Sequence, residues 1–382
     1  MTLIKYDYDV IVVGLGPAGS VASGVLSRKG YTVLGLEKKS HPRHKTCGGC
    51  LSARIVPWLE FDLSQVAENV IYGSKIYFRD RCGVERRSST PIAYTVKREN
   101  FDLKLIDQTR LHGTVVQENE QVTGINQEAD KVRVHTTKGQ YTARYVIGAD
   151  GATGAVARSI GIRPARRLYR AIENEFVLPQ EQTAVWRDTV VIHLGLAERG
   201  YGWVFPRGAM LTTGLAALGR SEVKLKSNLL YLNQTHQFGN GQFHGHLYGD
   251  VIPCFDGRRK RLSSGRVLLA GDAAGLVEPF IGEGIYYAVR SGHLAASVTA
   301  GALQNGSNQL TRYDDLIRRE LFNEFRWALY TARVAYFNQQ KTFDLIVAHP
   351  GVVNIFYQIL QGIGKYDQLA GLGWHHLLKK WI

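Results

Sequence analysis

The stretch DVIVVGLGPAGS, at residues 9–20, decides the fold of the first part of the chain. Its β-branched apolar run, Asp9 to Val13, predicts a buried strand, and small residues compatible with a helix follow it. The turn between strand and helix carries the pattern G-x-G-x-x-G, formed by Gly14, Gly16 and Gly19. This pattern allows a tight turn, close approach of the backbone to a pyrophosphate, and close packing of the helix on the strand.

A second strand and an acidic residue complete this unit. Tyr31 to Leu36 predicts the strand, and it ends in Glu37, eighteen residues after Gly19. The Glu37 carboxylate can hold a ribose hydroxyl, and the N-terminus of the intervening helix faces the anion. The sequence therefore predicts a dinucleotide site, whose further candidate residues are Pro17, Ala18 and Lys38.

A later segment distinguishes FAD from NAD, which share this fingerprint. The segment VLLAGDAAGLVEPFIGEGI, residues 267–285, resembles the second FAD motif of the para-hydroxybenzoate hydroxylase-like flavoproteins. The resemblance implies that Asp272 binds the ribityl chain and that glycines at the helix start lie against the isoalloxazine ring. A helix N-terminus suits that place, because its dipole and backbone donors favour the negative charge of reduced flavin. The cofactor residues implied here are Gly271, Asp272, Gly282, Gly284 and Ile285.

Two more segments match the same superfamily. The run VIGADG, residues 146–151, predicts a strand that ends in Asp150 and a glycine. Arg98, in VKRENFDLKL, corresponds to the superfamily arginine that opens a helix near the cofactor, although a plain helix-terminal charge is the alternative. The resemblance assigns both Asp150 and Arg98 to the FAD site.

Two motifs resemble the geranylgeranyl reductase family within that superfamily. They are KTCGGC at residues 45–50, followed by Ser52, and YGWVFP at residues 201–206, and the overall resemblance covers residues 5 to about 305. It implies that Cys47 and Gly48 lie near the flavin, and that Tyr201, Trp203, Phe205 and Pro206 lie beside the substrate. The implied reaction reduces isolated double bonds of prenyl chains on diphosphates, lipids or a chlorophyll precursor. Arg207 and Cys50 depart from the family pattern, which leaves the substrate open.

The residues themselves allow other interpretations of these motifs. Tyr201, Trp203 and Phe205 alternate along one strand, so they share one face, which suits either an apolar ligand or an ordinary sheet core. The C-x-x-C spacing of Cys47 and Cys50 is also found in redox dithiols and in half of a zinc site. No second pair of ligands has the spacing of a zinc site, so we expect no metal.

The predicted fold class is α/β. We expect a Rossmann-like FAD-binding domain, an inserted, mainly antiparallel β-sheet substrate domain, and a C-terminal helical region. The strand-like segments Lys75 to Val96 and Tyr169 to Leu218 should join in one sheet. The expected boundaries are 1–72, 97–165 and 258–310 for the FAD-binding domain, 73–96 and 166–257 for the substrate domain, and 311–382 for the helical region.

The expected chemistry is transfer of a hydride from reduced flavin to one alkene carbon and of a proton to the other. Cys47, Tyr201 and Trp203 are the candidate catalytic residues, and a bound water is an alternative acid. No second dinucleotide motif exists for NADPH, so the electron donor is either transiently bound NADPH or reduced ferredoxin. Two alternatives are an FAD-dependent monooxygenase or halogenase, whose W-x-W-x-I-P motif is absent, and a non-catalytic flavin-containing lipid-binding protein.

Composition adds expectations about partners and location. The 382 residues carry a net charge of +14, with basic clusters at 158–170 and 258–261, so an anionic partner is expected. No recognition motif for nucleic acid accompanies this charge. Four cysteines and no N-terminal secretory signal predict a cytoplasmic protein. The segment Leu369 to Ile382 could contact a membrane surface, although a helix packed on the body is favoured.

Overall fold

The strand that precedes the glycine turn lies at the centre of an eight-stranded sheet. The computed structural model describes residues 6–162, 167–179, 181, 184–218, 222–236, 238, 242–258, 261–307 and 309–371. β1 (Tyr8–Val13) pairs in parallel with β2 (Val33–Leu36) and β11 (Gln140–Gly148). The strand order is β17-β18-β11-β1-β2-β8, and β10 and β9 extend from β11. The other strands are β8 (Val115–Gln117), β9 (Val122–Gln127), β10 (Val132–Thr136), β17 (Ser263–Ser264) and β18 (Val267–Leu269).

Three long helices pack together beside this sheet, as the sequence predicts for a dinucleotide-binding fold. They are α1 (Pro17–Arg28), α2 (Arg98–Leu111) and α6 (Ile285–Asn305), and α1 contacts both of the others. The approach of α6 to α1 requires a glycine, because a Cβ at Gly292 would lie 2.5 Å from the carbonyl oxygen of Ala18. This packing brings the two nucleotide motifs, far apart in sequence, to one place.

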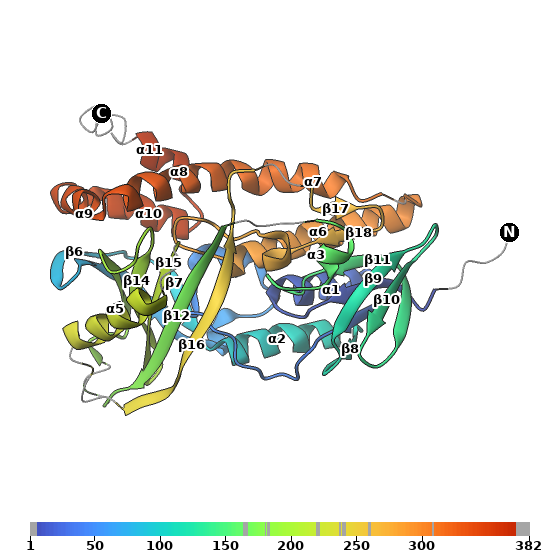
Figure 1. Cartoon of the computed structure of the whole chain (residues 1–382), viewed down its shortest axis with the longest axis horizontal. Coiled ribbons are helices and arrows are strands. Elements are labelled where there is room, and N and C mark those ends of the chain that lie inside the picture. The colour runs from blue at the N-terminus through green and yellow to red at the C-terminus, as the bar shows by residue number, and fades with distance from the viewer. Residues whose placement is uncertain are drawn as a thin grey trace.

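A seven-stranded sheet forms the other half of the molecule (Figure 1). Its order is β16-β12-β15-β14-β13-β5-β6, and only β13 and β5 pair in parallel. One face packs on α5 (Glu222–Thr235) through a core that includes Val204, Leu215 and Leu229. The strands are β5 (Gly73–Phe78), β6 (Arg81–Arg87), β12 (Arg167–Val177), β13 (Thr189–Leu194), β14 (Tyr201–Arg207), β15 (Met210–Ala217) and β16 (Gln242–Cys254).

A separate three-stranded sheet corrects one expectation. The segment 75–96 does not join the large sheet as a whole, because β7 (Ala93–Val96) pairs instead with β3 (Cys50–Ser52) and β4 (Ala67–Ile71). β3, which begins at Cys50 of the cysteine motif, pairs with one edge of β7, and β4 pairs with the other edge, so β7 is unavailable to β5 and β6. Short turns of helix connect these parts: η1 (Ala53–Trp58), η2 (Leu63–Gln65), α3 (Val156–Ser159) and η4 (Gly271–Ala274).

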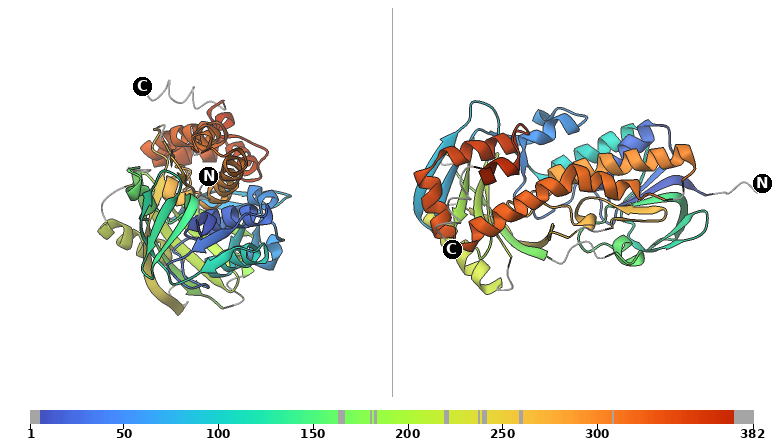
Figure 2. Two further views of the ribbon diagram at one scale, coloured as in Figure 1. Left: turned by 90° about the vertical axis from the view of Figure 1, so that its right-hand side faces the viewer. Right: turned by 90° about the horizontal axis from the view of Figure 1, so that it is seen from above.

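The region after Thr311 is helical, as the apolar spacing predicts. Figure 2 shows these helices lying over both sheets. They are α7 (Arg312–Ile317), a π-helical turn (Arg318–Phe322), α8 (Asn323–Phe337), α9 (Gln339–Ala348), α10 (Gly351–Leu360) and α11 (Tyr366–Gly371). Within the described part of the chain, no single helix has both the length and the apolar character to cross a membrane; α9 and α10 meet that test only jointly, at a bend of 102°.

Some sequence expectations fall on residues outside the described ranges. These are the basic residues Arg163, Arg166, Arg259 and Lys260, and the surface segment after residue 371, with Trp374, Lys379, Lys380 and Trp381. The domain boundaries given above stay a prediction.

Candidate active site

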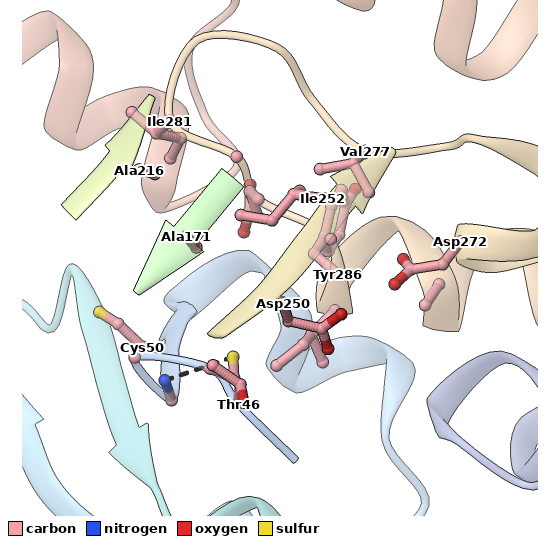
Figure 3. A pocket seen from close by; sticks show the side chains of 18 of the residues that line it. Thr46, Cys50, Ala171, Ala216, Asp250, Ile252, Asp272, Val277, Ile281 and Tyr286 are labelled. Carbon is pink, nitrogen blue, oxygen red and sulfur yellow. Dashed lines mark hydrogen bonds between the residues drawn. The ribbon is translucent and has the colours of Figure 1, made fainter. Parts of the chain in front are cut away.

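A cavity of about 710 Å³ receives residues from both large sheets, from the cysteine motif and from the C-terminal helices. Its lining includes the glycine turn, the second nucleotide motif and strands of the seven-stranded sheet. Figure 3 shows the part of the cavity around Asp250, Asp272 and Ala171. Of the candidate cofactor, substrate and catalytic residues, all but Gly19 and Pro206 line this cavity. Motifs separated by more than two hundred residues therefore meet around one space.

The glycine turn packs so closely on neighbouring backbone that a side chain would not fit at Gly14 or Gly19. Gly14 has a φ of +89°, and a Cβ there would lie 2.5 Å from the carbonyl oxygen of Ala149. A Cβ on Gly19 would lie 1.8 Å from the carbonyl oxygen of Gly14, so this glycine serves helix packing. Gly16 precedes α1 without a side-chain cap, and the first-turn amides are available to an anion.

Glu37 ties the turn to the end of β2. Its carboxylate is buried and accepts the N–H of Leu15 at 3.0 Å and that of Lys39 at 3.2 Å. Each oxygen keeps a second lone pair for a ligand hydroxyl. Lys38, beside it, also lines the cavity.

A buried ion cluster lies next to the turn. Arg98, the first residue of α2, donates to Asp102 from Nε at 2.9 Å and from Nη2 at 2.8 Å. Arg43 lies 3.4 Å from the same carboxylate, and its guanidinium is 3.7 Å from where a Cβ on Gly16 would be. The sequence reasoning missed Arg43, whose position on a loop gives no motif. Asp150 uses Oδ2 to accept the N–H of Val156, whereas its buried Oδ1 has no partner among the described residues.

The second nucleotide motif places one carboxyl and one helix N-terminus on the cavity. Asp272 lies in η4, and its carboxyl faces the same space as Asp250 (Figure 3). Burial raises the pKa of Asp272, while Lys45 and Arg98 oppose that rise. Gly284 precedes α6 without a side-chain cap. Gly271 and Gly282 both have positive φ, at +59° and +68°, which explains glycine at each.

The cysteine motif forms a turn across the cavity from Asp272. The Cys47 sulfur accepts the N–H of Gly49 at 3.4 Å, and Arg98 interacts with the same side chain. Both cysteines are free thiols. Burial, the Glu283 carboxylate and Cys47 raise the pKa of Cys50 to about 12, which disfavours the thiolate that disulfide exchange requires.

The aromatic residues of β14 share one face, as their alternation predicts. Tyr201, Trp203 and Phe205 line the cavity in sequence, with adjacent ring centroids 6.0 Å apart. The Tyr201 hydroxyl donates to the carbonyl of Ile281, and burial raises its pKa above the usual value for tyrosine. Pro206 does not contribute to the cavity lining, because alternate residues of a strand point to opposite faces.

Small residues on neighbouring strands make room in front of these rings. Ala171 on β12 pairs with Ala216 on β15, which pairs with Tyr201. Figure 3 shows Ala171 and Ala216 on the wall of the pocket. Sequence reasoning missed both, because only the strand register brings them beside the aromatic residues.

The part of the cavity lined by the large sheet, α9 and α10, here called the apolar branch, is mostly apolar, with Ser74, Thr342 and Tyr357 as polar exceptions. Ile76, Val190 and Ile192 come from the large sheet, and Ile346, Val353 and Phe356 come from α9 and α10. The C-terminal helices, which the sequence assigned only to closing the body, therefore form part of the site.

Arg54 joins the loop that precedes α6 to α8. Its guanidinium forms ion pairs with Glu283 and Glu324 and donates to the Tyr287 hydroxyl at 2.9 Å. Glu283 lies between Gly282 and Gly284, so the pair fixes the loop that opens α6. The sequence analysis missed Arg54, which belongs to none of the motifs.

Comparisons with known proteins agree with this geometry. The FAD binding domain family matches residues 7–212. A digeranylgeranylglycerophospholipid reductase of Methanocella arvoryzae is 30% identical over 336 residues, which is 83% of this chain and 84% of the relative. A geranylgeranyl bacteriochlorophyll reductase-like protein of Thermoplasma acidophilum has a TM-score of 0.80 at 25% identity, covering 89% of this chain and 90% of that one. The halogenase PltM, with a TM-score of 0.73 at 18% identity over 96% of this chain and 84% of its own, is similar in fold.

Proposed function

The chain belongs to the geranylgeranyl reductase family of FAD-dependent oxidoreductases, and we propose that it reduces isolated double bonds in the prenyl chains of a lipid. The relatives named as digeranylgeranylglycerophospholipid reductases point to a glycerophospholipid that carries geranylgeranyl chains. The observation that carries the proposal is the set of apolar side chains that the large sheet, α9 and α10 contribute to the same cavity as the nucleotide motifs.

The residues around the glycine turn fit FAD on their own chemistry. The buried Oδ1 of Asp150 lacks a partner among the described residues, and the uncapped start of α1 offers amides beside the Arg43 guanidinium. We assign the pyrophosphate to this turn with Arg43, and the adenosine ribose to Glu37. Asp272 would then hold the ribityl hydroxyls, and Gly282, Gly284 and Ile285, at the start of α6, would hold the flavin ring, where the helix dipole favours negative charge. When bound, FAD supplies the hydride for the reduction.

The substrate chain lies along the wall of β14 in this proposal. Tyr201, Trp203 and Phe205 offer flat apolar surface, and Ala171 and Ala216 leave space in front of them. A neutral alkene gains nothing from a charged pocket, so an apolar branch of this kind suits it.

Proton donation is the demand that an isolated alkene makes on the chain. Cys47 lines the cavity, and its sulfur contacts the N–H of Gly49 and Arg98, so the family motif makes it one candidate donor. Tyr201 suits the role less, because its hydroxyl proton is engaged by Ile281 and its pKa is raised. We therefore assign Tyr201 and Trp203 to binding and orienting the chain.

The electron donor and the membrane contact belong to the same proposal. A net charge of +14 favours an acidic donor such as reduced ferredoxin, or the phosphates of NADPH, and an anionic lipid surface as the source of substrate. To distinguish the two donors, reduced ferredoxin or NADPH is mixed anaerobically with the FAD-loaded protein, and reduction of the flavin is measured by its absorbance.

The test of the function is single-turnover reoxidation. FAD-loaded protein is photoreduced without oxygen and mixed with archaeal-type unsaturated ether lipids, polyprenyl diphosphates or prenylated pigments. We expect reoxidation with saturation of the lipid double bonds, measured by mass spectrometry, and fastest with the ether lipids. Rapid oxygen-coupled NADPH oxidation stimulated by an aromatic compound would instead favour a monooxygenase. Tight lipid binding without flavin turnover would favour a non-catalytic carrier.

A further inference from the structure

A row of residues across the seven-stranded sheet joins the aromatic wall to a buried carboxyl. Glu173 on β12 pairs with Gly214 on β15, and Gly214 pairs with Trp203 on β14. A Cβ on Gly214 would lie 2.1 Å from Cζ2 of Trp203, so the indole lies over this glycine. Glu173 and Trp203 therefore project from the same face on either side of a residue without a side chain.

Two buried polar atoms on this face lack a hydrogen-bond partner among the described residues. They are Oε2 of Glu173 and Nε1 of Trp203, and both residues line the cavity. Nε1 lies 3.1 Å from where a Cβ on Gly48 would be, and Oε1 of Glu173 accepts the N–H of Cys47 at 2.8 Å. The two atoms thus flank the cysteine turn. A buried polar atom without a partner is costly, so a site with two of them is built for a ligand atom or a water.

The charges that face Glu173 are already committed to other partners. Arg207 pairs with Glu175, Lys45 pairs with Asp250, and Arg98 pairs with Asp102. Glu173 itself is only 1% exposed. Each nearby cation therefore has its own carboxylate, although within the described part of the chain the buried Nε of Arg207 lacks a hydrogen-bond partner and no ion pair joins Glu173 to a cation. Burial raises the pKa of its carboxyl, although the Cys47 amide and the three cations oppose the rise.

We propose that Glu173, in place of the Cys47 thiol, is a protonated carboxylic acid that supplies the proton for double-bond reduction from Oε2, while the backbone N–H of Cys47 positions its carboxyl. This inference rests on the proposed function. The alkene π bond breaks, one carbon receives the hydride from reduced FAD, and the other receives the Glu173 proton. The carboxylate that remains is held by the Cys47 amide and faced by Arg207, Lys45 and Arg98. It regains a proton from solvent before the next turnover, so protons and electrons balance.

Infrared difference spectroscopy of the FAD-loaded protein tests the protonation without relying on turnover. Glu173→Gln is nearly isosteric and keeps an oxygen for the Cys47 amide. The spectrum of wild type minus Glu173→Gln should contain the C=O band of one protonated carboxyl at neutral pH, shifted in D2O. Glu85→Gln, at an exposed carboxyl paired with Lys75, is the matched control and should not remove such a band. Absence of the band from the Glu173 difference spectrum would overturn the proposal.

Reoxidation of photoreduced flavin by a prenyl ether lipid tests the proton transfer. We expect Glu173→Gln to slow reoxidation by about 100-fold or more, with FAD affinity retained. The wild-type rate should fall as pH rises through the pKa of Glu173, and the variant should lose that dependence. A variant with the wild-type rate and pH profile would refute the role while leaving the function intact. If wild-type protein is reoxidised by no prenyl compound, the function fails and the role with it.

Discussion

The loop between the two halves of the second nucleotide motif depends on one buried carboxyl, Glu278. This side chain is 0% exposed and accepts the N–H groups of Phe280 and Ile281, the latter at 2.8 Å. The carbonyls of the same loop accept hydroxyl groups from Tyr201 and Tyr336. Burial raises the pKa of Glu278 from 4.5 to about 8; Glu283 adds to the rise, and the backbone bonds and Arg54 oppose it.

This shift makes stability depend on pH with a definite sign. Between about pH 4.5 and pH 8 the folded protein keeps the Glu278 proton while the unfolded chain loses it. Ionisation of Glu278 therefore destabilises the folded state, and the free energy of unfolding falls as pH rises from about 4.5 to about 8. At about 1.4 kcal/mol per pH unit, a shift from 4.5 to about 8 corresponds to a loss of ~5 kcal/mol.

Glu278→Gln isolates this contribution because a glutamine cannot ionise. The measurement is urea unfolding of wild type and variant, in fixed excess FAD, at about pH 5 and about pH 9. Relative to wild type, the variant should gain about 4 kcal/mol of unfolding free energy from about pH 5 to about pH 9, because a small part of the titration lies below the lower pH. Glu85→Gln, at an exposed position, should show no such gain. Unfolding free energies of wild type and Glu278→Gln that change in parallel with pH would refute the reasoning.

Three further changes test the site. Gly14→Ala should weaken FAD binding by about 100-fold, measured by flavin fluorescence. The control Gly30→Ala has a similar φ of +86° but no atom within 4 Å of the added Cβ, so it should lower the unfolding free energy by only about 1 kcal/mol. Arg54→Met should lower the unfolding free energy by about 3 kcal/mol, because it leaves the buried Glu283 carboxylate unpaired. Ala216→Leu should fill the space before Tyr201, so prenyl-lipid affinity falls by at least about 10-fold while FAD affinity is unchanged.

The nucleotide half of the site was predictable because its signals are local. The glycines at 14, 16 and 19 lie between a strand and a helix, and each backbone constraint acts over a few residues. Alternation along β14 likewise gave the shared face of Tyr201, Trp203 and Phe205. The assignment of individual residues to cofactor and substrate stays a prediction.

The residues that the sequence did not reveal depend on pairing between distant strands. Glu173 meets Trp203 only through the register of β12, β15 and β14, and no local period fixes that register. β7 was assigned to the wrong sheet for the same reason: its residues suit any strand, and only β3 and β4 decide its partner. The apolar branch was missed because helices with an apolar face read as ordinary packing.

The arrangement of charge around the cavity bears on why a neutral alkene is the expected substrate. Buried ion pairs contribute little net stability compared with apolar packing of the same volume. Arg98 with Asp102, Arg207 with Glu175, and Arg54 with Glu283 nevertheless all lie around this one space. These clusters hold loops and strands in place, with Asp102 shared by Arg98 and Arg43, and Arg54 shared by Glu283 and Glu324. Against that background a single removable proton on Glu173 changes the local charge by one unit. Loss and recovery of this one proton are what the site needs if Glu173 protonates a carbon atom of the alkene and is then reprotonated by water.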